Sequence, residues 1–192
     1  MEPDWLLALM FTVVLWGVGQ VLAKEGTSLI GAGNMLFLYA LNTLIIWGGY
    51  CSFSQSVIIT PSLNIWGLVI LNSILSALGW LFYYLALERG KVSLVASTTS
   101  AYSLVAIIVA WMFLDEILSY WQYQGLFLVT ISIMALSYNP NNPTNPAVVQ
   151  GKGWLYWSFL SCLSWGIAVI ISKILVTEVG YINLMGLYVL LS

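Results

Sequence analysis

The sequence predicts an all-α protein, a polytopic bundle of transmembrane helices, and two observations support this fold class. Of the 192 residues, 61% are hydrophobic and only 6% are charged, whereas soluble domains carry about 25% charged residues. The hydrophobic residues form long continuous runs, and a soluble chain this short has too much surface to bury them all. The runs lack the alternation of barrel strands, and backbone groups in hydrocarbon must be paired, so the runs are predicted to be helices.

Six hydrophobic runs are long enough to span a bilayer, which takes about 20 residues for roughly 30 Å of hydrocarbon. They cover Trp5–Ala23, Asn34–Tyr50, Ile65–Leu87, Val92–Leu114, Tyr120–Ser137 and Trp154–Val176. A seventh run begins near Tyr181. The charged residues fall between these runs or at their edges, as expected when a charge at the bilayer centre costs at least about 2.5–3.5 kcal/mol.

The charge pattern excludes several classes of function. The net charge is −2 and the sequence has no basic patch, so no nucleic-acid partner is expected. The chain has no histidine, which removes the commonest metal ligand and the commonest general acid or base near neutral pH. We therefore expect no catalytic residue, no metal site and no cofactor. The expected partners are the lipid bilayer and an unknown small molecule, and the expected location is the cell membrane.

A polar segment divides the chain into two parts. Residues 139–153 contain Pro140, Pro143 and Pro146 among asparagines, and such a stretch cannot continue a helix. We predict a five-helix unit over residues 1–138, a Pro/Asn-rich linker over 139–153, and the start of a second unit over 154–192.

The segment after the linker resembles the start of the chain. A shift of 149 residues without gaps makes ten of the 39 overlapping positions identical, among them Trp16-Gly17 with Trp165-Gly166 and Lys24 with Lys173. One unit has five predicted spans, and an odd number places successive copies in opposite orientations. This is the inverted repeat of many secondary transporters. The second copy is expected to be cut off in its second helix, so the chain is expected to be a fragment of a longer protein.

Three stretches occur in an order and at a spacing typical of one family. They are Leu15–Lys24, Ala86–Ser93, and Ala110–Leu118 followed by Gln124-Gly125. Together they resemble the EamA-domain proteins of the drug/metabolite transporter superfamily. The resemblance covers the first unit in full and the second unit only to its second helix. It implies a transporter built from two inverted five-helix repeats.

The sequence departs from that family in two places. The family usually has a proline after a tyrosine in its fourth helix, whereas Tyr102 is followed here by Ser103. Small relatives of the family use a membrane glutamate in the first helix, and no acidic residue lies between Trp5 and Ala23. Proton coupling through that position is therefore not expected. The orientation stays open, because the positive-inside rule places the N-terminus outside while the resemblance implies an N-terminus inside.

Matched lysines and tryptophans are the first candidates for substrate binding. Lys24 and Lys173 could attract an anionic substrate, or their stems could lie along the helix while the ammonium groups reach the headgroups. Trp16 and Trp165 could line a cavity and stack on an aromatic or cationic substrate. Alternatively, the Trp-Gly pairs pack helices against one another, with the glycine allowing a close approach.

Polar and aromatic residues inside the predicted spans are the second group of candidates. They are Asn42, Trp80, Tyr83, Tyr102 and Ser103. Such groups could orient a substrate in a mostly apolar pocket, or they could form contacts between helices.

The leading hypothesis is a secondary transporter, an exporter of small metabolites or drugs that works by alternating access between inverted repeats. The alternatives are a non-transporting membrane scaffold or regulatory subunit, and an inactive truncated fragment of a transporter. The chain is expected to contain half of a cavity, so association of two copies is a further expectation. An enzyme is not expected.

Overall fold

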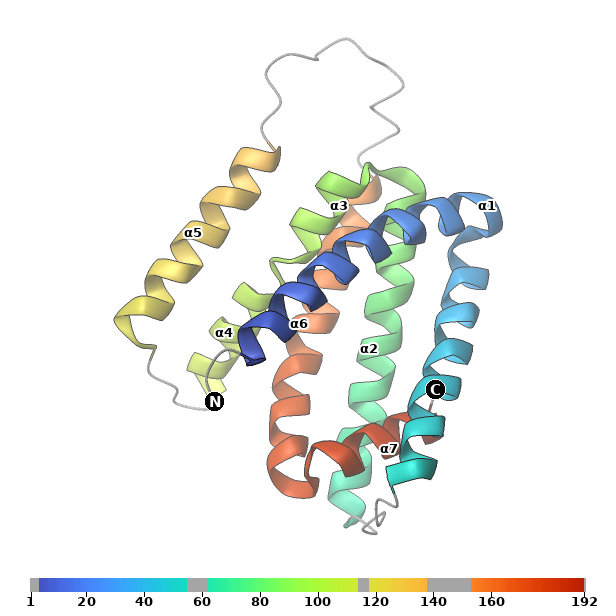
Figure 1. Ribbon diagram of the computed structural model, residues 1–192. Helices are drawn as coiled ribbons and strands as arrows, with labels where there is room; N and C mark the ends of the chain where they lie inside the picture. Colours follow the sequence, from blue (N-terminus) through green and yellow to red (C-terminus); the bar gives the residue numbers. More distant parts are fainter. Residues whose placement is uncertain (1–3, 55–61, 114–117, 138–152, 192) are drawn as a thin grey trace.

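The computed structural model describes residues 4–54, 62–113, 118–137 and 153–191, and these residues form seven helices (Figure 1). The helices are α1 (Asp4–Ser54), α2 (Leu63–Arg89), α3 (Val92–Thr99), α4 (Tyr102–Phe113), α5 (Tyr120–Ser137), α6 (Gly153–Val179) and α7 (Tyr181–Leu191). The described residues of the predicted runs thus lie in helices, apart from Ser100 and Ala101 in the fourth run. The predicted linker over 139–153 lies outside the described residues, apart from its last residue.

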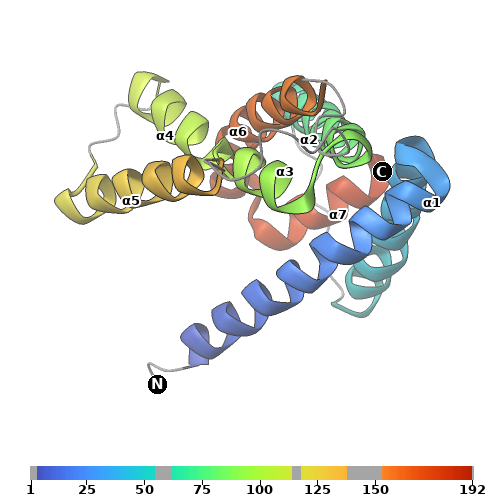
Figure 2. The same ribbon diagram turned by 90° about the horizontal axis from the view of Figure 1, so that it is seen from above.

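Helices α2 and α6 lie side by side at the centre and share the most extensive interface of the molecule. Helices α3 and α4 follow the length of α6, and α7 crosses the lower end of the bundle (Figures 1 and 2). The second half of α1 runs beside α2, whereas its first half extends away from the centre, as the view from above shows. Helix α5 contacts α3 on the side that faces away from α2 (Figure 2).

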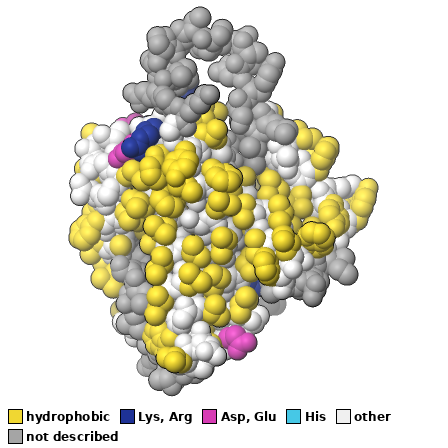
Figure 3. Space-filling model, turned by 180° about the vertical axis from the view of Figure 1, so that it is seen from behind, with side chains coloured by type: hydrophobic (Ala, Val, Ile, Leu, Met, Phe, Trp, Pro, Cys, Tyr) yellow, Lys and Arg dark blue, Asp and Glu magenta, His cyan; other side chains and the backbone are white. Residues whose placement is uncertain are grey.

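In the part of the chain that the structure describes, four helical stretches are long and apolar enough to cross a membrane by length and composition. They are Leu6–Tyr50, Leu63–Arg89, Val92–Phe113 and Gly153–Val179. Hydrophobic side chains cover most of the face drawn in Figure 3, and charged side chains gather near its ends. Since hydrocarbon accepts apolar surface and excludes charge, the chain is an integral membrane protein.

The first two predicted spans both lie in α1, one on each side of a kink. The helix continues past Ala23 to residue 30 and turns at Gly31 alone. This residue has φ 81° and ψ 162°, a backbone conformation that essentially only glycine adopts. No proline interrupts the segment, and one left-handed glycine is enough to make a sharp corner. We call residues 4–30 the first arm of α1 and residues 32–54 its second arm.

The corner at Gly31 has a counterpart between α6 and α7. Gly180 has φ 80°, and these two glycines are the ones with positive φ in the described part of the chain. The amide of Asn34 donates to the Ile30 carbonyl across the first corner, and the amide of Asn183 donates to the Val179 carbonyl across the second, both at 2.8 Å. Each pair of matched residues is separated by the same 149 positions that align the two segments.

The fourth predicted run is not one continuous helix. It bends between α3 and α4, where the N–H groups of Ala101, Ser103 and Leu104 donate to carbonyls three residues back. The hydroxyl groups of Thr99, Ser100 and Ser103 also donate to carbonyls of the preceding turn, at 2.7 to 3.2 Å. Such bonds compete with the helical pattern and bend helices. The bend therefore forms beside Tyr102 without the proline that the family usually has there.

Candidate substrate cavity

Two hydrogen bonds hold α2 and α6 together and define the wall of a cavity. The amide of Asn72 donates to the Ser172 hydroxyl at 2.8 Å, and the hydroxyl of Ser161 donates to the Gly79 carbonyl at 2.9 Å. Asn72 and Ser161 are fully buried. Polar bonds between small residues are a common way to join helices in lipid. They set the spacing of the two helices on which most of the cavity depends.

The cavity has a volume of about 490 Å³ and lies between α1, α2, α4, α6 and α7. Its walls carry six aromatic rings and six hydroxyl groups. The lining residues are Trp16, Leu36, Tyr39, Ala40, Thr43, Trp47, Ser73, Ser76, Ala77, Trp80, Tyr102, Trp165, Ala168, Val169, Ser172 and Met185. Pockets for small molecules have this size and this mixture of apolar surface with a few polar groups.

Three helices each contribute one stripe of residues spaced at three, four and seven positions, which is the spacing of one helix face. The stripe on the second arm of α1 passes through residues 36, 40, 43 and 47. The stripe on α2 passes through residues 73, 76, 77 and 80, and that on α6 through residues 165, 168, 169 and 172. The cavity forms because the three stripes face one another.

The indole of Trp80 is the centre of the aromatic wall. Its centroid lies 4.3 Å from that of Tyr39, 4.9 Å from that of Trp165 and 6.1 Å from that of Trp16. The Tyr39 ring is tilted by 34° against it, and the Trp165 ring meets it edge-on at 75°. These distances and tilts are those of favourable aromatic pairs. The rings come from the two arms of α1, from α2 and from α6.

The position of Trp165 depends on a glycine in the facing helix. A Cβ atom on Gly79 would collide with the Trp165 indole, so only glycine lets this ring lie against the backbone of α2. The side chain of Tyr83 packs beside Trp165, with 5.6 Å between the two ring centroids. It is only 1% exposed and does not line the cavity. Its hydroxyl has no hydrogen-bond partner among the described residues. We assign Tyr83 to the support of the aromatic wall.

The other polar candidates divide between the cavity and the surface. Tyr102 lines the cavity from the start of α4, with its ring 6.1 Å from that of Trp165. Its neighbour Ser103 does not line the cavity, and its hydroxyl donates to the Ser100 carbonyl. Asn42 is exposed on the outer side of α1 and does not reach the cavity either.

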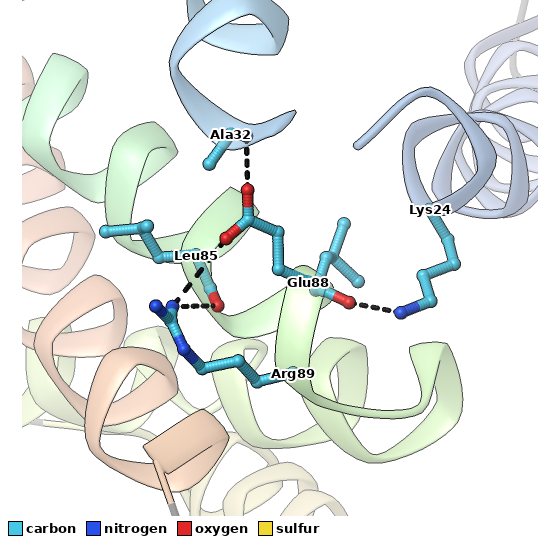
Figure 4. Close-up of polar contacts among 6 residues, drawn as sticks. Lys24, Ala32, Leu85, Glu88 and Arg89 are labelled. Atoms are coloured by element: carbon cyan, nitrogen blue, oxygen red, sulfur yellow. Dashed lines mark hydrogen bonds and ion pairs between the residues drawn. The ribbon is translucent and has the colours of Figure 1, made fainter. Parts of the chain in front are cut away.

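The structure places Lys24 at the end of α2 instead of in the cavity (Figure 4). Its ammonium donates to the carbonyls of Leu87, in the last turn of α2, and of Gly90, the residue that follows α2. The last carbonyls of a helix have no N–H partner within the helix. In return, the carboxylate of Glu88 accepts the backbone N–H of Ala32 at 2.5 Å, the first residue after the corner in α1. The two helices therefore cap each other. Lys173 is exposed on α6 and is not part of the cavity.

The position of Glu88 is further set by its neighbour. The guanidinium of Arg89 lies 3.8 Å from the Glu88 carboxylate and donates to the Leu85 carbonyl at 2.9 Å. It also lies 5.7 Å from the ring centroid of Trp157, a cation–π distance. The polar cluster of Lys24, Glu88 and Arg89 thus has a structural role at the end of the bundle.

Most of the cavity lining was not singled out in the sequence, including Tyr39, Thr43, Trp47 and Ser172. A signal was present, because the first three recur every four residues along one face and Ser172 follows Trp165 by seven. Each taken alone is an ordinary residue of a membrane helix, and only the meeting of three stripes distinguishes them.

Comparison with known families identifies the chain. The family model of the EamA-like transporter family matches residues 4–138. The chain belongs to this family. The match covers all five helices of the first predicted unit, and the family is one of transporters.

Two relatives are similar to this EamA-like chain. The uncharacterized transporter YvbV of Bacillus subtilis is 28% identical over 130 residues, which cover 67% of this chain and 43% of the relative. The chain thus spans less than half of the length of that protein. The uncharacterized protein MJ1333.1 of Methanocaldococcus jannaschii is 30% identical over 144 residues, which cover 71% of this chain and 98% of the relative. No solved structure matches the chain significantly.

Proposed function

We propose that this EamA-like protein is a secondary transporter of the cell membrane that exports small metabolites or drugs. The observation that carries the proposal is the cavity of about 490 Å³, whose aromatic and hydroxyl lining lies between membrane helices. A cavity with these groups can hold a small amphipathic solute by stacking and by hydrogen bonds. The cavity side chains Trp16, Trp80, Tyr102 and Trp165 are its proposed binding residues.

Transport is proposed to occur by alternating access between inverted repeats. The two corners at Gly31 and Gly180 support the equivalence of residues 154–192 with the start of the chain, since both have positive φ and both carry an asparagine bond across the turn. The units are residues 1–138 and 154–192, joined by residues 139–153. Binding sites of such transporters lie between the repeats.

A second unit also accounts for the exposed face of the first arm of α1. Helix α6 packs against α2, α3 and α4, so the matching face of the first arm is proposed to pack against the equivalent helices of a second unit. That unit belongs to a longer chain or to a second copy of this one. Crosslinking in membranes, followed by separation by size, will show whether the second unit is part of a longer chain or a second copy.

Counterflow in proteoliposomes tests the proposal. The purified protein is reconstituted with an internal panel of unlabelled amino acids, nucleosides and aromatic drugs, and uptake of each labelled solute is followed. At least one solute should accumulate transiently, and Trp80→Ala should abolish its accumulation. Trp121→Ala is the matched control, because this tryptophan is 77% exposed on α5, outside the cavity.

The proposal fails if correctly folded protein accumulates no solute of the panel and a specific membrane protein co-purifies with it. The protein would then be a scaffold or regulatory subunit instead of a transporter.

A further inference from the structure

The lining of the cavity contains no charged side chain among the residues that the structure describes. Lys24 is held on the carbonyls at the end of α2, and Glu88 is held on the backbone N–H of Ala32. A carboxylate or an ammonium in the cavity would therefore face no opposite charge. Burial of an unpaired charge is strongly unfavourable, much more so than burial of a neutral polar group.

The aromatic rings of the cavity favour a flat ligand. Tyr39 and Trp80 form a tilted pair with centroids 4.3 Å apart and an angle of 34° between the rings, and the Trp165 ring meets Trp80 edge-on at 4.9 Å. Faces and edges of aromatic rings attract another ring in offset-stacked and edge-on arrangements. The Trp165 ring is fixed in place because it lies against Gly79, so this part of the wall is formed before a ligand binds.

The hydroxyl groups supply a limited set of polar contacts. The hydroxyl of Thr43 donates to the Tyr39 carbonyl and that of Ser73 donates to the Val69 carbonyl, both at 2.9 Å. Each of these hydroxyl oxygens keeps its lone pairs as acceptors. The hydroxyl of Ser76, in the same stripe of α2, can donate or accept. A ligand with N–H or O–H groups beside its ring would find acceptors here.

We infer that the cavity takes an uncharged compound with a planar aromatic ring that carries amide or hydroxyl groups, in preference to an aromatic cation or carboxylate. The inference rests on the proposed function, since it names the class of solute for the same cavity. A cation would also be attracted by the tryptophan faces, but it would lose its hydration with no carboxylate in the lining to replace it. A neutral ring makes the same stacking contacts without that loss.

Three compounds with one ring system and different charges test the inference. Indole-3-acetamide is neutral, tryptamine is a cation and indole-3-acetate is an anion at pH 7. Their binding to the purified protein in detergent is measured by scintillation proximity with labelled compounds. The neutral amide should bind at least about tenfold tighter than the acetate, and tighter than tryptamine. Equal or tighter binding of either ion, or no binding of the amide to monodisperse protein, overturns the inference.

Two variants and one control connect the preference to the cavity. Trp165→Phe should weaken binding of the amide about tenfold, a change of about 1.4 kcal/mol. Trp157→Phe should leave it unchanged, because Trp157 lies on the same helix but stacks on Phe82 outside the cavity. Unchanged affinity in Trp165→Phe counts against the inference.

Ser76→Asp provides a second readout that does not depend on Trp165. At pH 8 the introduced carboxylate should reverse the preference, so that tryptamine binds tighter than the amide. If the order of the three compounds stays the same in this variant, the charge of the lining does not select the ligand and the inference fails. The binding assay needs no transport, so amide binding without counterflow would overturn only the proposed transport. Counterflow of ions without amide binding would overturn only the ligand class.

Discussion

The first arm of α1 and helix α6 carry the same residues at matched positions but lie in opposite surroundings. Both contain Trp-Gly followed by a lysine, at Trp16-Gly17 and Lys24 and again at Trp165-Gly166 and Lys173. Ten residues of α6 are buried within the protein, whereas residues 6–19 of the first arm are all exposed. A shared motif therefore determines which face of a helix is suited to close contact, while the neighbouring helices decide whether that contact exists.

The glycines of the two motifs show the difference most clearly. A Cβ atom on Gly166 would lie 2.6 Å from the Cβ of Val105 and 3.1 Å from the Tyr102 carbonyl oxygen, whereas one on Gly17 would meet nothing within 4 Å. The close approach of α6 to α4 depends on Gly166. Gly17 has no comparable role in the described part of the chain.

The largest expected effect is that of Gly166→Leu. The added side chain must push α4 and α6 apart, and overpacking of this kind costs about 1–3 kcal/mol or more. The midpoint of thermal unfolding in detergent, followed by circular dichroism, should fall markedly. Gly17→Leu is the matched control and should leave the midpoint nearly unchanged. Equal losses in both variants would show that the first arm is packed as closely as α6.

The corners provide the next test, because they are the features that the two segments share. Gly31→Ala and Gly180→Ala should each destabilise the protein by about 1–3 kcal/mol, since a side chain is strained at positive φ. Gly33→Ala, two residues beyond the first corner and inside the second arm, should be neutral or slightly stabilising, because alanine favours helix over glycine. Survival of folded protein after heating, measured by size-exclusion chromatography, compares the three.

A loss in only one of the two corner variants would be informative. It would mean that the matched geometry at Gly31 and Gly180 does not reflect matched roles, and the equivalence of the two segments would lose its structural support.

The smallest expected effect concerns the caps that join α1 and α2. Lys24→Met removes the ammonium from the carbonyls of Leu87 and Gly90 and should cost about 1 kcal/mol, the usual contribution of a cation at a helix C-terminus. Hydrogen exchange should increase locally at the end of α2 and at the corner of α1. Lys91→Met is the control, because the ammonium of Lys91 makes no hydrogen bond or ion pair within the described residues. Similar exchange in both variants would contradict the capping role.

Part of the cavity lining could be recognised from the sequence, because large aromatic residues are conspicuous inside membrane spans. Trp16, Trp80, Tyr102 and Trp165 line the cavity, and their binding of a substrate stays a prediction. Lys24 and Asn42 lie outside the cavity, which the sequence had left open, since a helical pattern does not say which neighbour a side chain meets. The carbonyls that bind Lys24 are more than 60 positions away along the chain.

The sequence by itself determined that the chain is a set of membrane helices. The reason is that long apolar runs without charge leave the backbone only one way to pair its polar groups in hydrocarbon. Tertiary structure alone decided where these helices turn and what they enclose. It placed the first corner at Gly31, bent α3 from α4 without a proline, and brought three helix faces together as one cavity. A hydrophobic pattern allows several arrangements of the helices. Contacts between distant segments select one of them, and the pattern does not specify those contacts.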